Sequence, residues 1–93
     1  MEVTLTIEDT KGTAHVGPLS DPTAHMEFSI AGPQLIIISH TEVGESLRGQ
    51  GVGRQLLDKV VEHARANGIK IMPLCPYAKS VFDKDPSIGD VLK

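Results

Sequence analysis

Three glycines at alternate positions, Gly49, Gly51 and Gly53, come directly after Arg48, where an apolar run gives way to a helical pattern. Glycine leaves no Cβ to hold a ligand away, and a helix entrance leaves backbone N–H groups without partners. The positive end of the helix dipole adds to these donors, so a turn of this kind favours phosphate oxygens. Residues 48–53 therefore predict a pyrophosphate cradle, with a flexible loop that binds nothing as the alternative.

The glycine spacing argues against two common classes of phosphate-binding loop. A dinucleotide fold has glycine at the first, third and sixth positions, but counting from Gly49 and Gly51 the sixth residue is Arg54. A P-loop needs Lys and then Ser or Thr after its second glycine. Gly44 and Gly49 have the P-loop separation, but Gln50 and Gly51 occupy those two places.

The remaining pattern, Arg-x-x-Gly-x-Gly over residues 48–53, resembles the pyrophosphate loop of the GNAT superfamily of acetyl-CoA-dependent N-acyltransferases. That loop reads Gln/Arg-x-x-Gly-x-Gly/Ala before a helix. Residues 40–43, 61–65 and 75–79 extend the resemblance to the small single-domain GNAT-like branch labelled YjdJ-type. Residues 1–24 match only as generic strand material.

The resemblance implies acetyl-CoA or coenzyme A as cofactor, and an unidentified amine, small molecule or peptide, as acetyl acceptor. Main-chain N–H groups of residues 48–53 would hold the pyrophosphate, and the guanidinium of Arg54 would add a contact. Val43 would bond the pantetheine through its backbone, while Tyr77 and Lys79 would contact the pantetheine or the nucleotide. The expected cofactor-binding residues are Val43, Arg48, Gly49, Gln50, Gly51, Val52, Gly53, Arg54, Tyr77 and Lys79.

Two residues are candidates for the acyl-transfer chemistry, which needs a held carbonyl, a route for the amine proton and stabilisation of the leaving sulfur. Cys75 ends the strand expected to flank the thioester, where it would accept the acetyl group or contact the CoA sulfur. His40 ends the other flanking strand and is the second candidate. The alternatives are a buried, inert cysteine and a structural histidine.

Other chemistries find no support in the sequence. His15, His25, His40 and His63 show no metal-ligand spacing, and Cys75 has no Cys-x-x-Cys partner, so we expect no metal. The serines stand in polar, turn-like surroundings, which argues against a hydrolase. Two further functions stay open: a non-catalytic CoA or acyl-CoA-binding module, and a protein-interaction domain.

The elements before the loop read as strands. Residues 3–8 alternate apolar and polar, a turn follows at 9–12, and residues 13–16 suggest a second strand before a loop with two prolines. Residues 26–30 alternate again and turn into the apolar run 35–39, which predicts a strand covered on both faces.

A crossover helix and a closing helix complete the pattern. The expected inner face of the first is Val52, Leu56, Leu57, Val60, Val61 and Ala64, with Gly68 as its stop. Residues 69–74 should then run parallel to 35–39 and diverge near Val43 and Leu74, leaving backbone groups for a pantetheine chain. Pro76 opens a short last helix. The predicted fold class is α/β (α+β): a minimal GNAT-like fold with a mixed, mostly antiparallel sheet.

Length and composition indicate the number of domains, the partners and the location to expect. The 93 residues suit a single domain, 1–93, and a formal charge of −3 without a basic patch argues against nucleic acid or an anionic membrane as partner. One cysteine excludes an internal disulfide, and no leader or membrane-length apolar run is visible, so we expect a cytoplasmic monomer or weak dimer.

Overall fold

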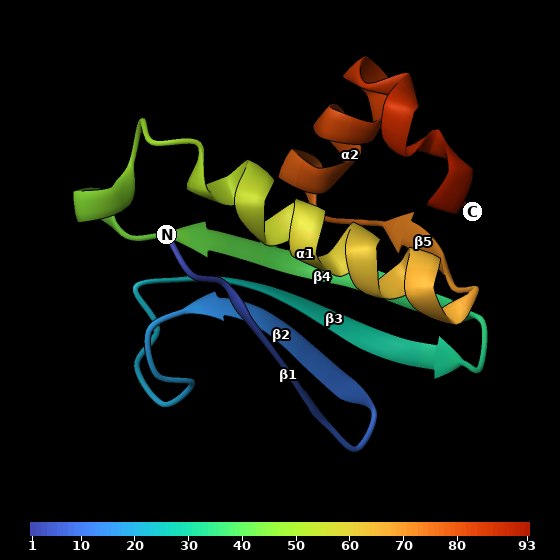
Figure 1. The fold of residues 1–93 in the computed structure, drawn as a ribbon, viewed down its shortest axis with the longest axis horizontal. Helices are drawn as coiled ribbons and strands as arrows, with labels where there is room; N and C mark the ends of the chain where they lie inside the picture. Colours follow the sequence, from blue (N-terminus) through green and yellow to red (C-terminus); the bar gives the residue numbers. More distant parts are fainter.

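Five strands form one sheet in the order in which they occur along the chain (Figure 1). The computed structural model describes residues 1–93. The first three strand pairs are antiparallel and the last pair is parallel, so the predicted mixed, mostly antiparallel sheet is confirmed. The strands are β1 (Thr4–Glu8), β2 (Lys11–Val16), β3 (Ala24–Gly32), β4 (Leu35–Val43) and β5 (Lys70–Pro73).

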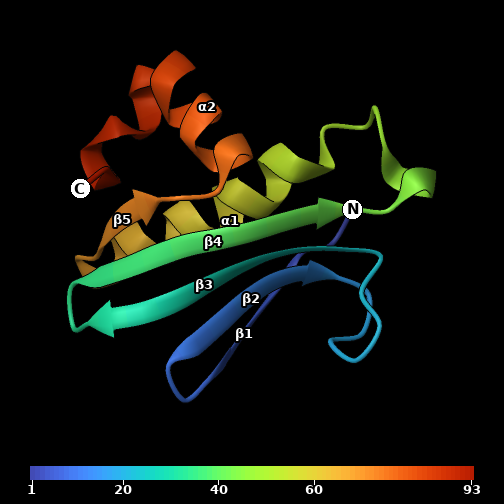
Figure 2. The ribbon, with the colours of Figure 1, turned by 180° about the vertical axis from the view of Figure 1, so that it is seen from behind.

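The crossover helix α1 (Val52–Asn67) lies over one face of the sheet; seen from behind, β4 crosses in front of it (Figure 2). The short helix α2 (Pro76–Lys84) lies beyond β5, and the 3₁₀ helices η1 (Glu45–Leu47) and η2 (Pro86–Val91) precede α1 and follow α2. Neither α1 nor α2 has the combined length and apolar character needed to cross a bilayer.

The core forms where α1 meets the sheet. All the apolar residues predicted for the inner face of α1 are buried: Val52, Leu56, Leu57, Val60, Val61 and Ala64. They belong to one cluster with Met26, Phe28, Ile36 and Ile38 of the sheet. Each fully buried Val or Leu contributes about 1.5–3 kcal/mol before chain entropy is subtracted. Gly68 ends the helix in the predicted left-handed conformation, with φ +65°.

Three local predictions need correction. Strand β2 begins at Lys11 rather than residue 13, because the preceding turn needs only Asp9 and Thr10, with Asp9 left-handed at φ 55°. Strand β4 continues to Val43 instead of ending at residue 39. Leu35 and Ile37 are only half-buried, so the prediction of a strand covered on both faces was wrong for the side away from α1.

The parallel strands separate as predicted, and the separation begins earlier than expected. Strand β5 pairs with β4 only as far as Ile38 and Pro73. The N–H groups of Leu74 and Cys75 both donate to the Ile38 carbonyl at 3.0 Å, and β5 then turns away. From residue 39 onward, β4 pairs with β3 alone. Residues 39–43 therefore present one unpaired backbone edge beside the entrance of α1.

Candidate functional site

The entrance of α1 is open. Gly49 and Gly51 are left-handed at φ +78° and φ +70°, and a Cβ on either would meet nothing within 4 Å. No side chain caps the helix, and its first turn carries no acidic residue. The first helical hydrogen bond runs from Gln55 N–H to Gly51 C=O at 3.2 Å. The N–H groups of residues 51–54, at the positive end of the dipole, have no backbone partner and are therefore available to a ligand.

These donors face a pocket of about 230 Å³ between the unpaired edge of β4 and the first turn of α2. The pocket brings together seven of the ten predicted cofactor-binding residues, and it adds Thr41 and Leu47. Its lining residues are Thr41, Val43, Leu47, Arg48, Gly49, Gly51, Val52, Gly53 and Tyr77. The loop, the open strand edge and both helix entrances thus contribute to one cavity.

Tyr77 closes this pocket on the α2 side, and Gly53 makes room for it. A Cβ on Gly53 would lie 3.0 Å from Cζ and 3.1 Å from Oη of Tyr77. Tyr77 is 37% exposed, and its partial burial raises the pKa of the Tyr77 phenol. Glycine is needed at position 51 because the backbone there is left-handed, and at position 53 because a side chain would crowd the ring of Tyr77.

Cys75 lies at the point where β5 and β4 separate. It is 4% exposed and precedes the first residue of α2 as its N-cap. Its thiol donates to the hydroxyl of Thr41, with Sγ and Oγ1 3.2 Å apart. Because Thr41 lines the pocket, this contact joins the predicted reactive thiol to the cavity wall. Sequence reasoning gave Thr41 no site role, since the contact joins residues distant in the chain.

Residues 13–91 match the sequence model of the GCN5-related N-acetyltransferase family. The chain belongs to this family. A GCN5-like protein of Staphylococcus aureus, solved by NMR, is 34% identical, with a TM-score of 0.74 over 97% of this chain and 87% of that one. No curated protein matches the sequence.

Two more distant structures show the same fold. The ribosomal-protein-alanine N-acetyltransferase of Brucella melitensis biovar Abortus 2308 is 14% identical, with a TM-score of 0.65. This chain covers 62% of that one, and 83% of this chain is matched. A GNAT family acetyltransferase of Elizabethkingia anophelis with acetyl-CoA bound is 18% identical, with a TM-score of 0.56. The match covers 69% of this chain and 42% of that one.

Three of the residues expected to contact the cofactor do not line the pocket. The guanidinium of Arg54 bonds Asp58 at 2.8 Å and Asp85 at 2.7 Å, and these two hydrogen bonds raise the pKa of Arg54. Gln50 donates to the Ser46 carbonyl at 3.2 Å, and Lys79 pairs with Asp83 at 3.1 Å. Arg54 is therefore left with its backbone N–H as its contribution to the helix entrance.

The structure does not bring the two candidate catalytic residues of this family member together. His40 pairs across the sheet with Glu27, and its ring lies 5.5 Å from the ring of His25. Thr41, the next residue, faces the pocket, and neighbouring strand residues point to opposite faces. His40 therefore lies on the side of the sheet away from α1, while Cys75 and Thr41 lie beside the pocket.

Proposed function

We propose that this protein binds acetyl-CoA in the pocket at the entrance of α1 and transfers the acetyl group to an amine. The observation that carries the proposal is the set of unpaired N–H groups at an uncapped helix entrance, beside an unpaired strand edge. Membership of the GCN5-related family supports it, as does the fold shared with a neighbour that has acetyl-CoA bound.

The pyrophosphate is bound by backbone groups. Gly51, Val52 and Gly53 line the pocket, and a charge-assisted hydrogen bond to a phosphate oxygen contributes about 1.5–3 kcal/mol. No carboxylate in the first turn opposes an anion, and Arg48 on the rim adds a positive charge. These features favour a diphosphate without a lysine clamp.

The pantetheine extends the sheet. Residues 39–43 of β4 have one unpaired edge, so the amides of a pantetheine chain bond there as an added strand does. Val43 contributes its backbone, and Leu47 and Tyr77 form apolar walls of the same pocket. This path leads from the α1 entrance toward Thr41 and Cys75, where the thioester comes to lie.

In the transfer, the amine nitrogen bonds the acetyl carbon, the carbon–sulfur bond breaks, and the amine's proton ends on the CoA sulfur. Cys75 acts in one of two ways. As a transient acceptor, its sulfur takes the acetyl group while its proton passes to CoA, and the amine then displaces the Cys75 thiol, which takes up the amine's proton. Otherwise its S–H hydrogen-bonds the departing CoA sulfur while that sulfur takes the amine's proton. The two roles leave different products on the protein, so mass measurement separates them.

A non-catalytic CoA-binding module is the second candidate function. It is favoured by the composition of the pocket, whose lining includes no histidine and no carboxylate to accept the amine's proton. The nearly complete burial of Cys75 points the same way. Cofactor binding with no acetyl transfer to any amine would support this module.

Calorimetric titration with CoA and acetyl-CoA tests the site through Gly51→Glu. Gly68→Glu is a matched control at the other end of the same helix, because Gly68 is also left-handed and also faces open space. Both variants carry the same backbone strain and the same new carboxylate. We expect Gly51→Glu to lose at least about tenfold in affinity, the equivalent of one charge-assisted hydrogen bond, and Gly68→Glu to bind normally. Equal affinities in the two variants would contradict the proposal.

A further inference from the structure

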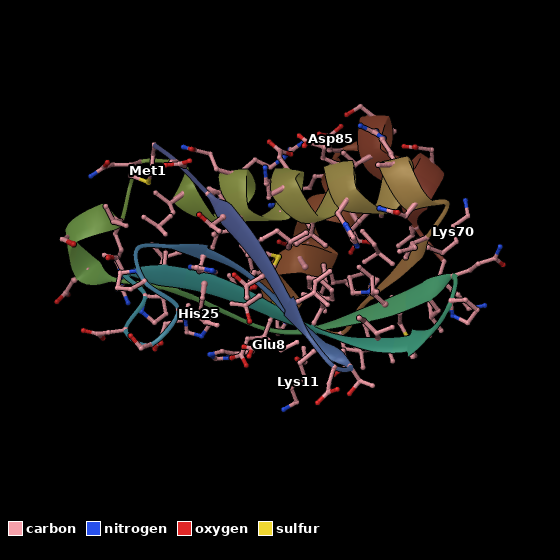
Figure 3. All side chains as sticks on the ribbon, turned by 60° about the horizontal axis from the view of Figure 1, so that its bottom comes forward. Met1, Glu8, Lys11, His25, Lys70 and Asp85 are labelled. Atoms are coloured by element: carbon pink, nitrogen blue, oxygen red, sulfur yellow. The ribbon has the colours of Figure 1, made fainter.

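Four residues of metal-ligating type form a square array on the sheet face away from α1. His25 lies directly opposite Glu42, and Glu27 directly opposite His40, on the paired strands β3 and β4. Residues two apart on a strand share a face, and opposed residues have Cβ atoms about 4.5–5.5 Å apart. Figure 3 shows His25 on this side of the sheet, with Glu8 and Lys11 further along it.

The spacing of the histidines along the chain predicted no metal site, but the strand register brings the ligand atoms of three members close together. One donor atom each from His25, His40 and Glu42 lies within 4.8 Å of the other two. Zinc–nitrogen bonds are about 2.0–2.1 Å long, so two ligands of one tetrahedral ion lie about 3.4 Å apart. Side-chain rotations that move each donor by about an ångström therefore close the site around an ion, while the hydrogen-bonded backbone of β3 and β4 stays in place.

The surroundings suit a cation. Oε2 of Glu27 lies 3.2 Å from Nε2 of His25, a contact of the kind by which carboxylates orient metal-bound histidines. His25 and Glu42 line an open hollow of about 340 Å³, in which Arg48 is the one Arg or Lys residue. Ions can reach the donors from solvent through this hollow.

We propose that His25, His40 and Glu42 bind a divalent transition metal ion of the zinc class, with Glu27 orienting His25. Two imidazoles and a carboxylate are the ligands that zinc and its borderline neighbours take in proteins. The three ligands lie on the sheet face away from α1, whereas the acetyl-CoA pocket lies beside α1, and the hollow next to His25 and Glu42 shares Val43 and Arg48 with that pocket. The metal proposal does not depend on the function proposed for the pocket.

Cobalt and zinc titrations of the full chain at neutral pH test this site. We expect Co²⁺ to produce visible absorption bands that Zn²⁺ abolishes, and calorimetry to show one Zn²⁺ bound per chain. Replacing an orienting group costs about 10- to 100-fold in metal affinity, so His40→Ala and Glu42→Gln, which remove ligands, should cost at least as much. His40 and Glu42 are exposed, and both variants should keep their fold and their CoA affinity.

His63→Ala is the matched control, because His63 lies on α1 and is bonded to Asn67. It should bind Co²⁺ as the wild type does. Absence of Co²⁺ bands and of Zn²⁺ heat at millimolar metal would overturn the proposal. So would an equal loss of affinity in His63→Ala and His40→Ala, because the metal would then be held nonspecifically by surface histidines.

Discussion

The thiol of Cys75 and the hydroxyl of Thr41 lie 3.2 Å apart, and their contact bridges the gap where β5 leaves β4. Thr41 belongs to the unpaired edge of β4, and Cys75 is the N-cap of α2. Thr41 also lines the pocket beside the entrance of α1. Cys75, the one cysteine of the chain, is therefore the thiol whose hydrogen-bond partner lies at the proposed cofactor pocket.

Replacing Cys75 by alanine tests its part in acetyl transfer. We expect wild-type protein incubated with acetyl-CoA to gain the mass of one acetyl group if the thiol is a transient acceptor, and Cys75→Ala to gain none. Because Cys75 is absent from the pocket lining, CoA affinity should stay within about twofold. Intact-mass measurement and calorimetry give the two readings.

Cys75→Ser serves as the comparison, since it keeps a hydrogen-bond donor toward Thr41 while removing the sulfur. If Cys75 only donates to the CoA sulfur, the serine variant should retain more transfer activity than the alanine variant, and no acetylated protein should form. Wild-type transfer rates in both variants would remove Cys75 from the mechanism.

The positions of His40 and Thr41 show what the sequence could not predict. Continuing the alternation of the buried residues Ile36 and Ile38 would place His40 on the α1 face. The pairing shifts by one residue instead, because Phe28 pairs with Ile38 whereas Glu27 pairs with His40. Ser39 has no residue directly opposite it in β3, and such a shift moves every later side chain to the other face. It puts Thr41 at the pocket and His40 beside His25.

Features set by neighbours along the chain were predicted well. The buried face of α1, the glycine stop at Gly68 and the separation of β4 from β5 follow from periodicity, capping and crossover geometry. Contacts between side chains distant in sequence were not predicted. The ion pair of Arg54 with Asp85 and the close approach of His25 and His40 depend on packing and on strand register.

The contact of Gly53 with Tyr77 predicts that Gly53→Ala changes the free energy of unfolding in opposite directions in the wild type and in Tyr77→Ala. Alanine replacing glycine inside a helix normally stabilises by roughly 0.5–1 kcal/mol. Here the new Cβ would lie 3.0 Å from the ring, so Gly53→Ala should destabilise the wild type and stabilise Tyr77→Ala. Urea unfolding of the two single variants and the double variant measures the coupling. Simple additivity would show that the ring moves aside freely.

Gly12 should tolerate no side chain. A Cβ there would overlap the ring of Phe28, which is itself 2% exposed within the core. Overpacking of this kind costs about 1–3 kcal/mol or more, so Gly12→Ala should lower the free energy of unfolding by at least that range. Gly32→Ala is the control, because a Cβ there meets nothing within 4 Å. Similar urea midpoints for the two variants would contradict the close packing of β2 against Phe28.

Asp85 should make stability depend on pH in the acid range. Hydrogen bonds from Ser87 and from Arg54 lower the pKa of the Asp85 carboxyl from 3.8 to about 2. A carboxyl with a lowered pKa in the folded state contributes stability that is fully present above its unfolded value and is lost as pH falls through the folded value. The wild type should therefore exceed Asp85→Asn in unfolding free energy at neutral pH, and the difference should shrink as pH falls from about 3.8 to about 2.

Asp83→Asn is a suitable control, because Asp83 pairs only with the exposed Lys79. If the difference in unfolding free energy between wild type and Asp85→Asn stayed constant to the lowest pH, Arg54 and Ser87 would not stabilise the ionised carboxylate. The ion pair between Arg54 and Asp85 would then not link α1 to the end of α2.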